Sequence, residues 1–332
     1  MKKIILAVLA IAALAACNKT EVVGVTESNA IAFDNAFVDN ATKSVNDPSF
    51  TNSNLFNDFA VYGFVEGAVL FDGTQVSKAI TNNDLESDWK YEGTQYWIAG
   101  AQYKFNAVAP MTNGGWTKTA ADAASTTLSF TNNGTTDLLY ATAAQEGKVS
   151  GNEQVAFSFR HVLSKVKFSF ENAYNATNAT IRVKDITITN PHKTADVVLA
   201  YDTVWSNLTA TDLVLEFGMA TDDEATADVK ENVEVAYAFG KTYESQNELF
   251  LIPSDTYEYN VTFNVELLVS SSVVKTYAHT VKAEFAPAPG NSYDIKAVIN
   301  AENIDPANEQ EPIEFTVNTL PDWGTANNVD AQ

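Results

Sequence analysis

Apolar and polar side chains alternate along most of this chain with a period of two. In residues 102–110, for example, Tyr103, Phe105 and Ala107 fall on one face and polar side chains fall on the other. Alternation over about four to eight residues indicates half-buried strands, and the longer period of a helix is nearly absent here. Many short strands separated by turns predict an all-β protein made of sandwich domains.

Two of the predicted strands carry information beyond their position. Ile181 and Val183 are in one phase and Ile186 is in the other, so the slip at 184–185 predicts a bulge. Residues 248–253 are apolar on both faces, which predicts a central strand that ends at its proline. The other ranges that we read as strands are 59–65, 102–110, 128–130, 137–142, 155–159, 165–170, 259–269, 273–285, 293–299 and 313–317.

Two stretches interrupt the alternating pattern. Residues 112–125 are small and polar, so we expect a loop there, with a short helical turn at 120–124. Residues 301–312 are polar and acidic, and they are read as a linker before the last strand at 313–317.

The first residues have the composition of a secretory signal. Lys2 and Lys3 precede a thirteen-residue apolar run, Ile4 to Ala16, that is too short to span a membrane, which takes ~20 residues. The run ends in Leu-Ala-Ala-Cys, the pattern of a bacterial lipobox, and Cys17 is the only cysteine, so it has no disulfide partner. We predict a lipoprotein signal peptide at 1–16 and lipid on Cys17. A plain signal peptide with an incidental cysteine is the alternative.

Residues 17–47 read as a tether that contains a short β-like segment. Ile31 and Phe33 lie in the apolar core of that segment, and Lys43 follows in an open polar stretch, with Ser44 after it. A lone basic residue beside a strand is compatible with a protease site between Lys43 and Ser44. Composition alone favours the alternative, an ordinary tether with a solvated lysine.

The length of 332 residues allows two domains of ordinary size. We place their boundary near residue 160, between two predicted strands. The expected organisation is therefore a signal peptide and a tether, then an N-terminal sandwich at 48–160 and a C-terminal sandwich at 161–332.

The formal net charge of the chain is −22. Such a charge repels the phosphates of nucleic acid, so we expect no nucleic-acid partner. It also argues against a polybasic membrane patch. The charge fits a soluble body held off an anionic bacterial surface, and it helps to keep secreted copies apart.

Catalytic and metal-binding motifs are missing from the sequence. It holds no Gly-x-Ser-x-Gly, His-Glu-x-x-His or Cys-x-x-Cys pattern, no Walker loop and no dinucleotide fingerprint. His161, His192 and His279 lie far apart, and His161 is expected to close a structural hydrogen-bond network. The acidic run 222–224 could hold calcium, but it lacks the EF-hand spacing, and a solvated loop is favoured. We predict no enzyme, no metal and no cofactor.

One aromatic cluster has two interpretations. Trp89, Tyr91, Tyr96 and Trp97 lie close together in the sequence and could form a platform on which a sugar stacks. Because the cluster lies between short strands, we favour a place in the core.

Several short motifs, taken in order, resemble a known family. They are Asp88-Trp89-Lys90-Tyr91 with Tyr96-Trp97, Phe105-Asn106-Ala107-Val108-Ala109-Pro110, Asp137-Leu138-Leu139-Tyr140-Ala141, Phe157-x-Phe159-x-His161-x-Leu163-Ser164-Lys165-Val166, Leu251-Ile252-Pro253, Gly290-Asn291-Ser292-Tyr293-Asp294-Ile295, and Ile313-x-Phe315-x-Val317 with Trp323. Together with the lipobox, these motifs make the chain similar to the fimbrillin-like lipoproteins of Bacteroidales, the type V pilins with their anchors and tips.

The resemblance implies two tandem transthyretin-like β-sandwich domains, and export as a lipoprotein to the outer membrane and a cell-surface fimbrium. In polymerising members, a trypsin-like protease cuts after a basic residue near the end of the first strand. Its removal opens a groove that a strand of another subunit fills. Lys43 stands at the position of that basic residue, and Ile31 and Phe33 would lie on the removed strand. Lysine replaces the more familiar arginine, so an Arg-specific protease would spare it.

The last strand, with Ile313, Phe315 and Val317, is our hypothetical donor. The leading interpretation is thus a structural or adhesive fimbrial subunit, with other subunits, the outer membrane through Cys17, and a host or bacterial surface ligand as partners. Two alternatives are a glycan-binding surface lipoprotein and a hydrolase with an unrecognised carboxylate pair.

Overall fold

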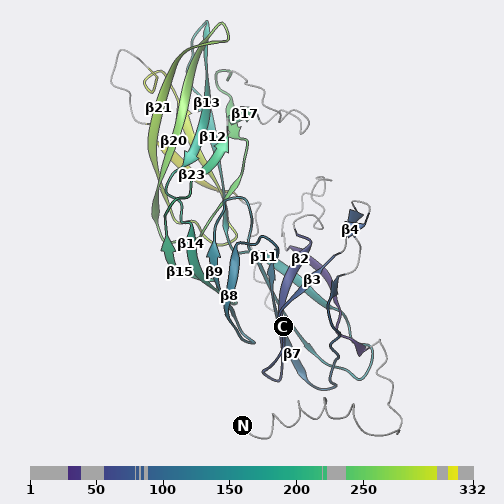
Figure 1. Cartoon of the computed structure of the whole chain (residues 1–332). Coiled ribbons are helices and arrows are strands. Elements are labelled where there is room, and N and C mark those ends of the chain that lie inside the picture. The colour runs from purple at the N-terminus through teal and green to yellow at the C-terminus, as the bar shows by residue number, and fades with distance from the viewer. Residues whose placement is uncertain are drawn as a thin grey trace, which may run out of the picture.

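The computed structural model describes residues 29–38, 56–78, 80–81, 84–85, 89–218, 220–222, 237–304 and 313–320. The regular elements in these ranges are strands, with no α-helix among them, which confirms the predicted all-β class. The ribbon is elongated, with one group of sheets toward each end and a smaller sheet between them (Figure 1). In the described part, no helix has the length and the apolar character needed to cross a membrane.

The first half of the chain builds a seven-stranded sheet with the order β1-β11-β10-β7-β2-β3-β6. Its strands are β1 (Phe33–Val38), β2 (Asp58–Val65), β3 (Ala68–Ser77), β6 (Lys90–Tyr91), β7 (Gln102–Ala109), β10 (Leu139–Glu146) and β11 (Val155–His161). The alternation predicted for β7 is observed in part. Tyr103, Phe105 and Ala107 are buried on one face, whereas on the other face Gln102 and Lys104 are exposed but Asn106 and Val108 are buried. The pairing of β1 with β11 is parallel, and the other pairs in this sheet are antiparallel. A separate small hairpin joins β4 (Ile80–Thr81) to β5 (Asp84–Leu85).

A second, four-stranded sheet joins the two halves of the chain, and we call it the shared sheet. Its order is β15-β14-β9-β8, with β8 (Trp116–Ala121), β9 (Thr126–Thr131), β14 (Thr194–Leu199) and β15 (Val204–Thr209). The antiparallel pairing of β9 with β14 runs from Thr131 opposite Thr194 to Thr126 opposite Leu199. A single boundary near residue 160 therefore separates two strands that are neighbours in one sheet.

The prediction of a loop over residues 112–125 is wrong in part, because β8 pairs along β9. Its sequence, Trp-Thr-Lys-Thr-Ala-Ala, shows no apolar alternation, since β8 is an edge strand with little to bury. The predicted helical turn is replaced by the end of β8 and a turn at Asp122. There the carboxylate Oδ1 of Asp122 accepts hydrogen bonds from the backbone N–H groups of Ala124 and Ser125.

The second half forms a sandwich of two sheets around one core. One sheet has the order β17-β18-β12-β22-β23, with β19 also on β12, and the other has the order β16-β13-β20-β21. The strands of the first are β12 (Ser164–Asn172), β17 (Ala220–Asp222), β18 (Thr242–Ser245), β19 (Leu249–Leu251), β22 (Ser292–Ile299) and β23 (Phe315–Leu320). Those of the second are β13 (Ala179–Ile188), β16 (Leu215–Gly218), β20 (Tyr257–Val269) and β21 (Ser272–Phe285).

The predicted bulge in β13 is confirmed. Asp185 has a positive φ of 55°, and the register of β13 against β20 shifts between Lys184 and Thr187. This extra residue lets the side chains on either side of the slip face the same core, where Ile181 and Ile186 are both fully buried.

The prediction of a central strand at 248–253 is wrong, although its apolar character is explained. β19 pairs with one neighbouring strand, β12. Leu249 and Leu251 pack into the core of the second half, whereas Phe250 and Ile252 pack into the core between the shared sheet and the seven-stranded sheet. The strand is apolar on both faces because it lies between two cores.

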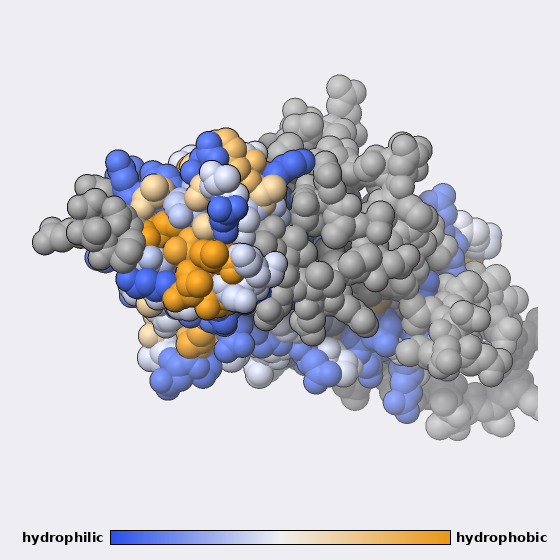
Figure 2. Space-filling view, turned by 90° about the horizontal axis from the view of Figure 1, so that it is seen from above, coloured by the Kyte–Doolittle hydropathy of each residue, from blue (hydrophilic) through white to orange (hydrophobic). Residues whose placement is uncertain are grey.

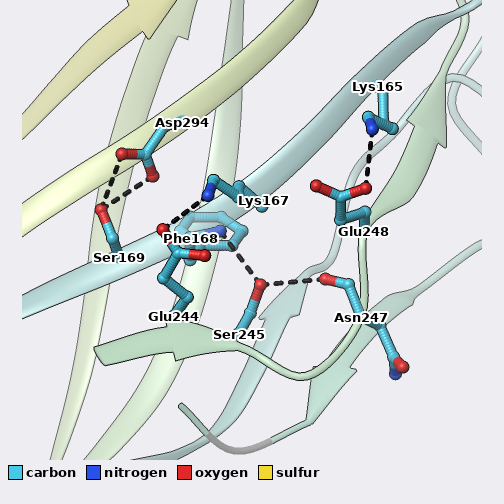
Figure 3. A network of polar contacts seen from close by, with 9 residues as sticks. All are labelled: Lys165, Lys167, Phe168, Ser169, Glu244, Ser245, Asn247, Glu248 and Asp294. Carbon is cyan, nitrogen blue, oxygen red and sulfur yellow. Dashed lines mark hydrogen bonds and ion pairs between the residues drawn. The ribbon is translucent and has the colours of Figure 1, made fainter. Parts of the chain in front are cut away.

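The outward face of β12 is held by polar contacts (Figure 3). Lys165 and Lys167 form ion pairs with Glu248 and Glu244 at 2.7 and 2.5 Å. β18 and β19 pair with the two ends of β12 and leave the backbone N–H of Phe168 between them. The hydroxyl of Ser245 accepts a hydrogen bond from that N–H at 3.1 Å, which satisfies it.

Candidate functional site: the seat of the N-terminal segment

The structure places some of the predicted site residues and not others. Ile31 and Phe33 lie within the described residues, as does the final strand β23. Cys17, Lys43 and Ser44 lie outside the described residues, so their predicted roles stay predictions.

The backbone of residues 29–31 is bound along one side by the chain that follows β6. The N–H of Ile31 donates to the carbonyl of Gln95 at 2.8 Å, and the N–H of Trp97 donates to the carbonyl of Asn29 at 3.1 Å. This pairing is antiparallel and attaches the segment next to the strand at one edge of the seven-stranded sheet.

The same segment continues into β1, which forms the opposite edge of that sheet. β1 runs parallel to β11, from Phe33 opposite Val155 to Val38 opposite Phe159. The N–H of Val155 also donates to the carbonyl of Ala32 at 2.8 Å. Residues 29–38 therefore connect the two edges of the sheet and close it around its core.

The side chains of this segment fill the enclosed core. Ile31 and Phe33 are each only 2 % exposed. The ring of Phe33 lies 5.5–6.3 Å, centroid to centroid, from rings on β2, β3, β6, β7 and β11, namely Phe59, Phe71, Tyr91, Phe105 and Phe157. Because these five rings come from five strands, Phe33 occupies the centre of the closed sheet.

Polar side chains fix the position of the segment along the groove. The hydroxyl of Tyr91 donates to the carbonyl of Ile31 at 2.8 Å, and burial raises the pKa of Tyr91, which keeps this donor protonated. The amide of Asn29 donates to the carbonyl of Trp97 at 3.0 Å and accepts from the amide of Asn152 at 2.6 Å. Asn29 and Asn152 carry no motif, so nothing in the sequence pattern could have identified them.

The aromatic cluster belongs largely to this core. Trp89 and Trp97 are 9 % and 4 % exposed, and both pack in the same core as Phe33. Tyr91 is bonded to the segment, and Tyr96 is the most exposed of the four. Buried indole rings cannot stack on a sugar, so the described structure favours the core interpretation.

The hypothetical donor strand is seated on its own sandwich. β23 starts at Phe315, two residues later than the predicted strand, and pairs antiparallel with the edge of β22. Ile313 is 4 % exposed, and the ring of Phe315 lies 5.7 Å from that of Phe168. Phe315 and Val317 are half-buried against the core.

The three histidines of the described part have separate surroundings. His161 Nδ1 contacts the carboxylate of Asp137, as expected for a structural histidine. His192 and His279 pack against aromatic rings, and burial lowers the pKa of both. Among the described residues, no group of three or more His, Cys, Asp or Glu could hold a metal ion.

Comparison with known proteins gives two family matches. The profile of a family described as fimbrillin-like matches residues 42–323. The profile of a prokaryotic membrane lipoprotein lipid attachment site matches residues 1–18, a range that contains Cys17. None of the curated proteins matches the chain.

A solved fimbrial protein shares the fold at low sequence identity, and two further matches have lower TM-scores. A fimbrial protein from Bacteroides vulgatus is 14 % identical, with a TM-score of 0.59 over 87 % of this chain and 99 % of that chain. A putative cell adhesion protein from Bacteroides uniformis is 16 % identical, with a TM-score of 0.47 over 92 % of this chain and 100 % of that one. The fimbrial anchor protein Mfa2 from Porphyromonas gingivalis is 12 % identical, with a TM-score of 0.38 over 87 % of this chain and 96 % of Mfa2.

Proposed function

The chain belongs to the fimbrillin-like family of lipid-anchored surface fimbrial proteins, and on that premise we propose that it polymerises by strand exchange. In this proposal Cys17 carries the lipid, and a trypsin-like protease cuts between Lys43 and Ser44. The segment with Ile31 and Phe33 then leaves, and the final strand of another subunit takes its place. A structural role of this kind needs no catalytic site.

The seat of residues 29–38 is the observation that carries the proposal. The segment closes the sheet from both edges, and its Phe33 ring is surrounded by five others. Its departure would leave the edge of β11 without its partner and expose an aromatic trough. An unpaired edge beside exposed apolar surface is a template for an added strand.

The N-terminal segment and the proposed donor strand have the same spacing of isoleucine and phenylalanine. Ile31 and Phe33 are spaced as Ile313 and Phe315 are, with one residue between them. A donor strand could therefore put an isoleucine and a phenylalanine into the positions that the first segment vacates. Covering the apolar surface of the empty groove favours uptake of a new strand, whereas burial of Ile313, already only 4 % exposed on its own sandwich, adds little on transfer.

Limited trypsin treatment of the lipid-free protein, residues 18–332, tests this function. We expect N-terminal sequencing to find Ser44 as the new first residue, and electron microscopy to find fibres. Lys43→Gln is the matched control, because trypsin cannot cut there, and it should stay monomeric. Lys43→Arg should additionally allow activation by an Arg-specific protease.

Deletion of residues 311–332 separates folding from assembly. We expect the cut, truncated protein to remain folded by circular dichroism but to form no fibres. Fibres of normal length from the truncated protein would rule out β23 as the donor, and a clean cut at Lys43 without any fibres would rule out the exchange.

A further inference from the structure

One end of the molecule carries an exposed apolar patch, which we call the tip patch. It consists of Val269, Val273 and Val274, which are 38 %, 44 % and 56 % exposed at the turn of the β20–β21 hairpin. Figure 2 looks onto this end and shows a cluster of hydrophobic surface there. Exposed apolar residues that cluster at one place mark interaction surfaces more often than scattered ones do.

The tip patch is held by a well-defined turn. Ser270 and Ser271 both have positive φ, 50° and 64°, and together they form the two-residue connection between β20 and β21. Such a turn matches the twist of a hairpin and keeps the flanking strands in register. The valines are therefore presented on a regular hairpin and not on an irregular loop.

The opposite end of the molecule carries a second patch, which we call the mouth patch. It consists of Tyr96, Ile98 and Val149, which are 41 %, 50 % and 81 % exposed. The two loops that carry these residues are joined, because the N–H of Gly100 donates to the carbonyl of Gly147 at 2.7 Å.

The mouth patch adjoins the groove of the N-terminal segment. Tyr96 forms an antiparallel bridge with Ala30, and Asn152, three residues after Val149, bonds to the side chain of Asn29. The groove thus opens beside this patch. A strand that enters the groove from outside brings its own subunit against the mouth patch.

Strand direction shows which end of the incoming subunit arrives there. β1 runs from the mouth end toward the middle of the molecule, because it is parallel to β11. β11 ends at His161, just before β12 starts the second half at Ser164. β23 runs from the tip end toward the middle, with Phe315 opposite Ala297 and Leu320 opposite Ser292. A detached final strand therefore stays tethered at the tip end of its own subunit and can enter a neighbour's mouth in the direction of β1.

We propose that the tip patch of one copy docks on the mouth patch of a second copy, so that subunits join head to tail. This inference rests on the proposed strand exchange and adds a second interface to it. A contact between two different surfaces of the same chain is heterologous, and it generates an open fibre when the rotation from one copy to the next does not close a ring.

Charge supports a second copy as the occupant of each patch. The net charge of −22 makes two copies repel each other over most of their surfaces. The segments 96–103 and 267–274 contain no charged residue, although Lys148 flanks Val149 and the Glu66 carboxylate accepts a hydrogen bond from the N–H of Gln102 at 2.8 Å. The two ends can therefore meet without bringing carboxylates together, as the cores of protein interfaces generally require.

Fibre growth by the trypsin-cut, lipid-free protein tests the docking. Val273→Ser with Val274→Ser removes the tip patch, and Ile98→Ser with Val149→Ser removes the mouth patch. Val204→Ser with Val214→Ser is the matched control, because these valines are 56 % and 51 % exposed but belong to neither patch. We expect each patch variant to elongate at least tenfold more slowly than wild type, and the control to elongate normally.

A synthetic peptide of residues 311–332 separates this inference from the exchange itself. We expect all variants to take up the peptide within twofold of wild type, because the groove is intact in each. Peptide uptake together with unchanged elongation in both patch variants would overturn the docking, whereas failure of wild type to take up the peptide would overturn the exchange.

A disulfide test reads the docking without reference to the groove. The lipid-free protein has no cysteine, so Val274→Cys with Ile98→Cys introduces one thiol at each end. Oxidation should give a ladder of covalent oligomers, whereas Val274→Cys with Val204→Cys should not. Without a ladder, and with unchanged elongation, the proposal is wrong.

Discussion

Truncation of Phe33 to alanine should destabilise the first half of the molecule more than most single substitutions. The ring is 2 % exposed and contacts five other rings, so the surrounding strands cannot all move inward to fill the space it leaves. Replacing a buried phenylalanine by alanine costs about 3–5 kcal/mol in unfolding free energy. We expect a loss in that range.

Urea unfolding of the uncut, lipid-free protein measures this loss. Trp89 and Trp97 lie in the same core as Phe33, so intrinsic fluorescence reports on the relevant region. Phe239→Ala is the matched control, because Phe239 is 59 % exposed. Its substitution should change the unfolding free energy by less than about 0.5 kcal/mol.

The same substitution should loosen the segment once the chain is cut at Lys43. A loss of about 3–5 kcal/mol corresponds to a dissociation constant roughly 100-fold to several thousand-fold higher. In the cut protein without residues 311–332, which has no donor strand to displace the segment, gel filtration should show the Phe33→Ala segment leaving faster than the wild-type segment. A loss below about 1 kcal/mol, with both segments retained equally, would refute the argument that this ring closes the core.

Three further predictions concern the second half. The free energy of unfolding should fall as the pH drops below about 6.5. Burial lowers the pKa of His279, so at that residue the unfolded chain binds more protons than the folded one. Urea unfolding at several pH values should show a flatter slope for His279→Phe. Glu266→Gln should lower the free energy of unfolding by about 3–5 kcal/mol in the same assay, because it breaks a buried 2.5 Å ion pair with Arg182. Glu258→Gln, in the exposed pair with Lys282, should lower it by less than about 1 kcal/mol. Ser270→Asn with Ser271→Gly should raise the melting temperature, because each serine sits at positive φ at a cost of about 1 kcal/mol, and no increase would contradict that strain.

Alternation located strands that have one buried and one more exposed face, such as β11 and β20, but it did not locate β3, β14 or β15. It also located the bulge in β13, because the apolar residues change phase between Val183 and Ile186, on either side of Asp185. β8 was not predicted as a strand. It is an edge strand with threonine, lysine and alanine side chains, which bury little surface and give no alternating pattern. β19 was misjudged because burial by two cores and burial within a sheet give the same apolar run.

The alternation of apolar and polar residues does not predict which distant strands pair with each other. Nothing in β9 or β14 marks them as neighbours, because their contact is decided by how the two halves pack together. The parallel pairing of β1 with β11 likewise depends on the closure of the whole sheet. Ile31 and Phe33 could be identified as apolar strand residues in advance, but the amide contact between Asn29 and Asn152 exists only in the folded chain.

The shared sheet has a mechanical consequence. If the two halves were joined by a covalent linker alone, a pull on the ends would first straighten that linker. Here β9 and β14 are paired along their whole length, so the load crosses from one half to the other through a ladder of backbone bonds. Stretching the subunit must break that ladder before the halves can separate, and under the proposed assembly each subunit of a fibre would resist tension at its middle.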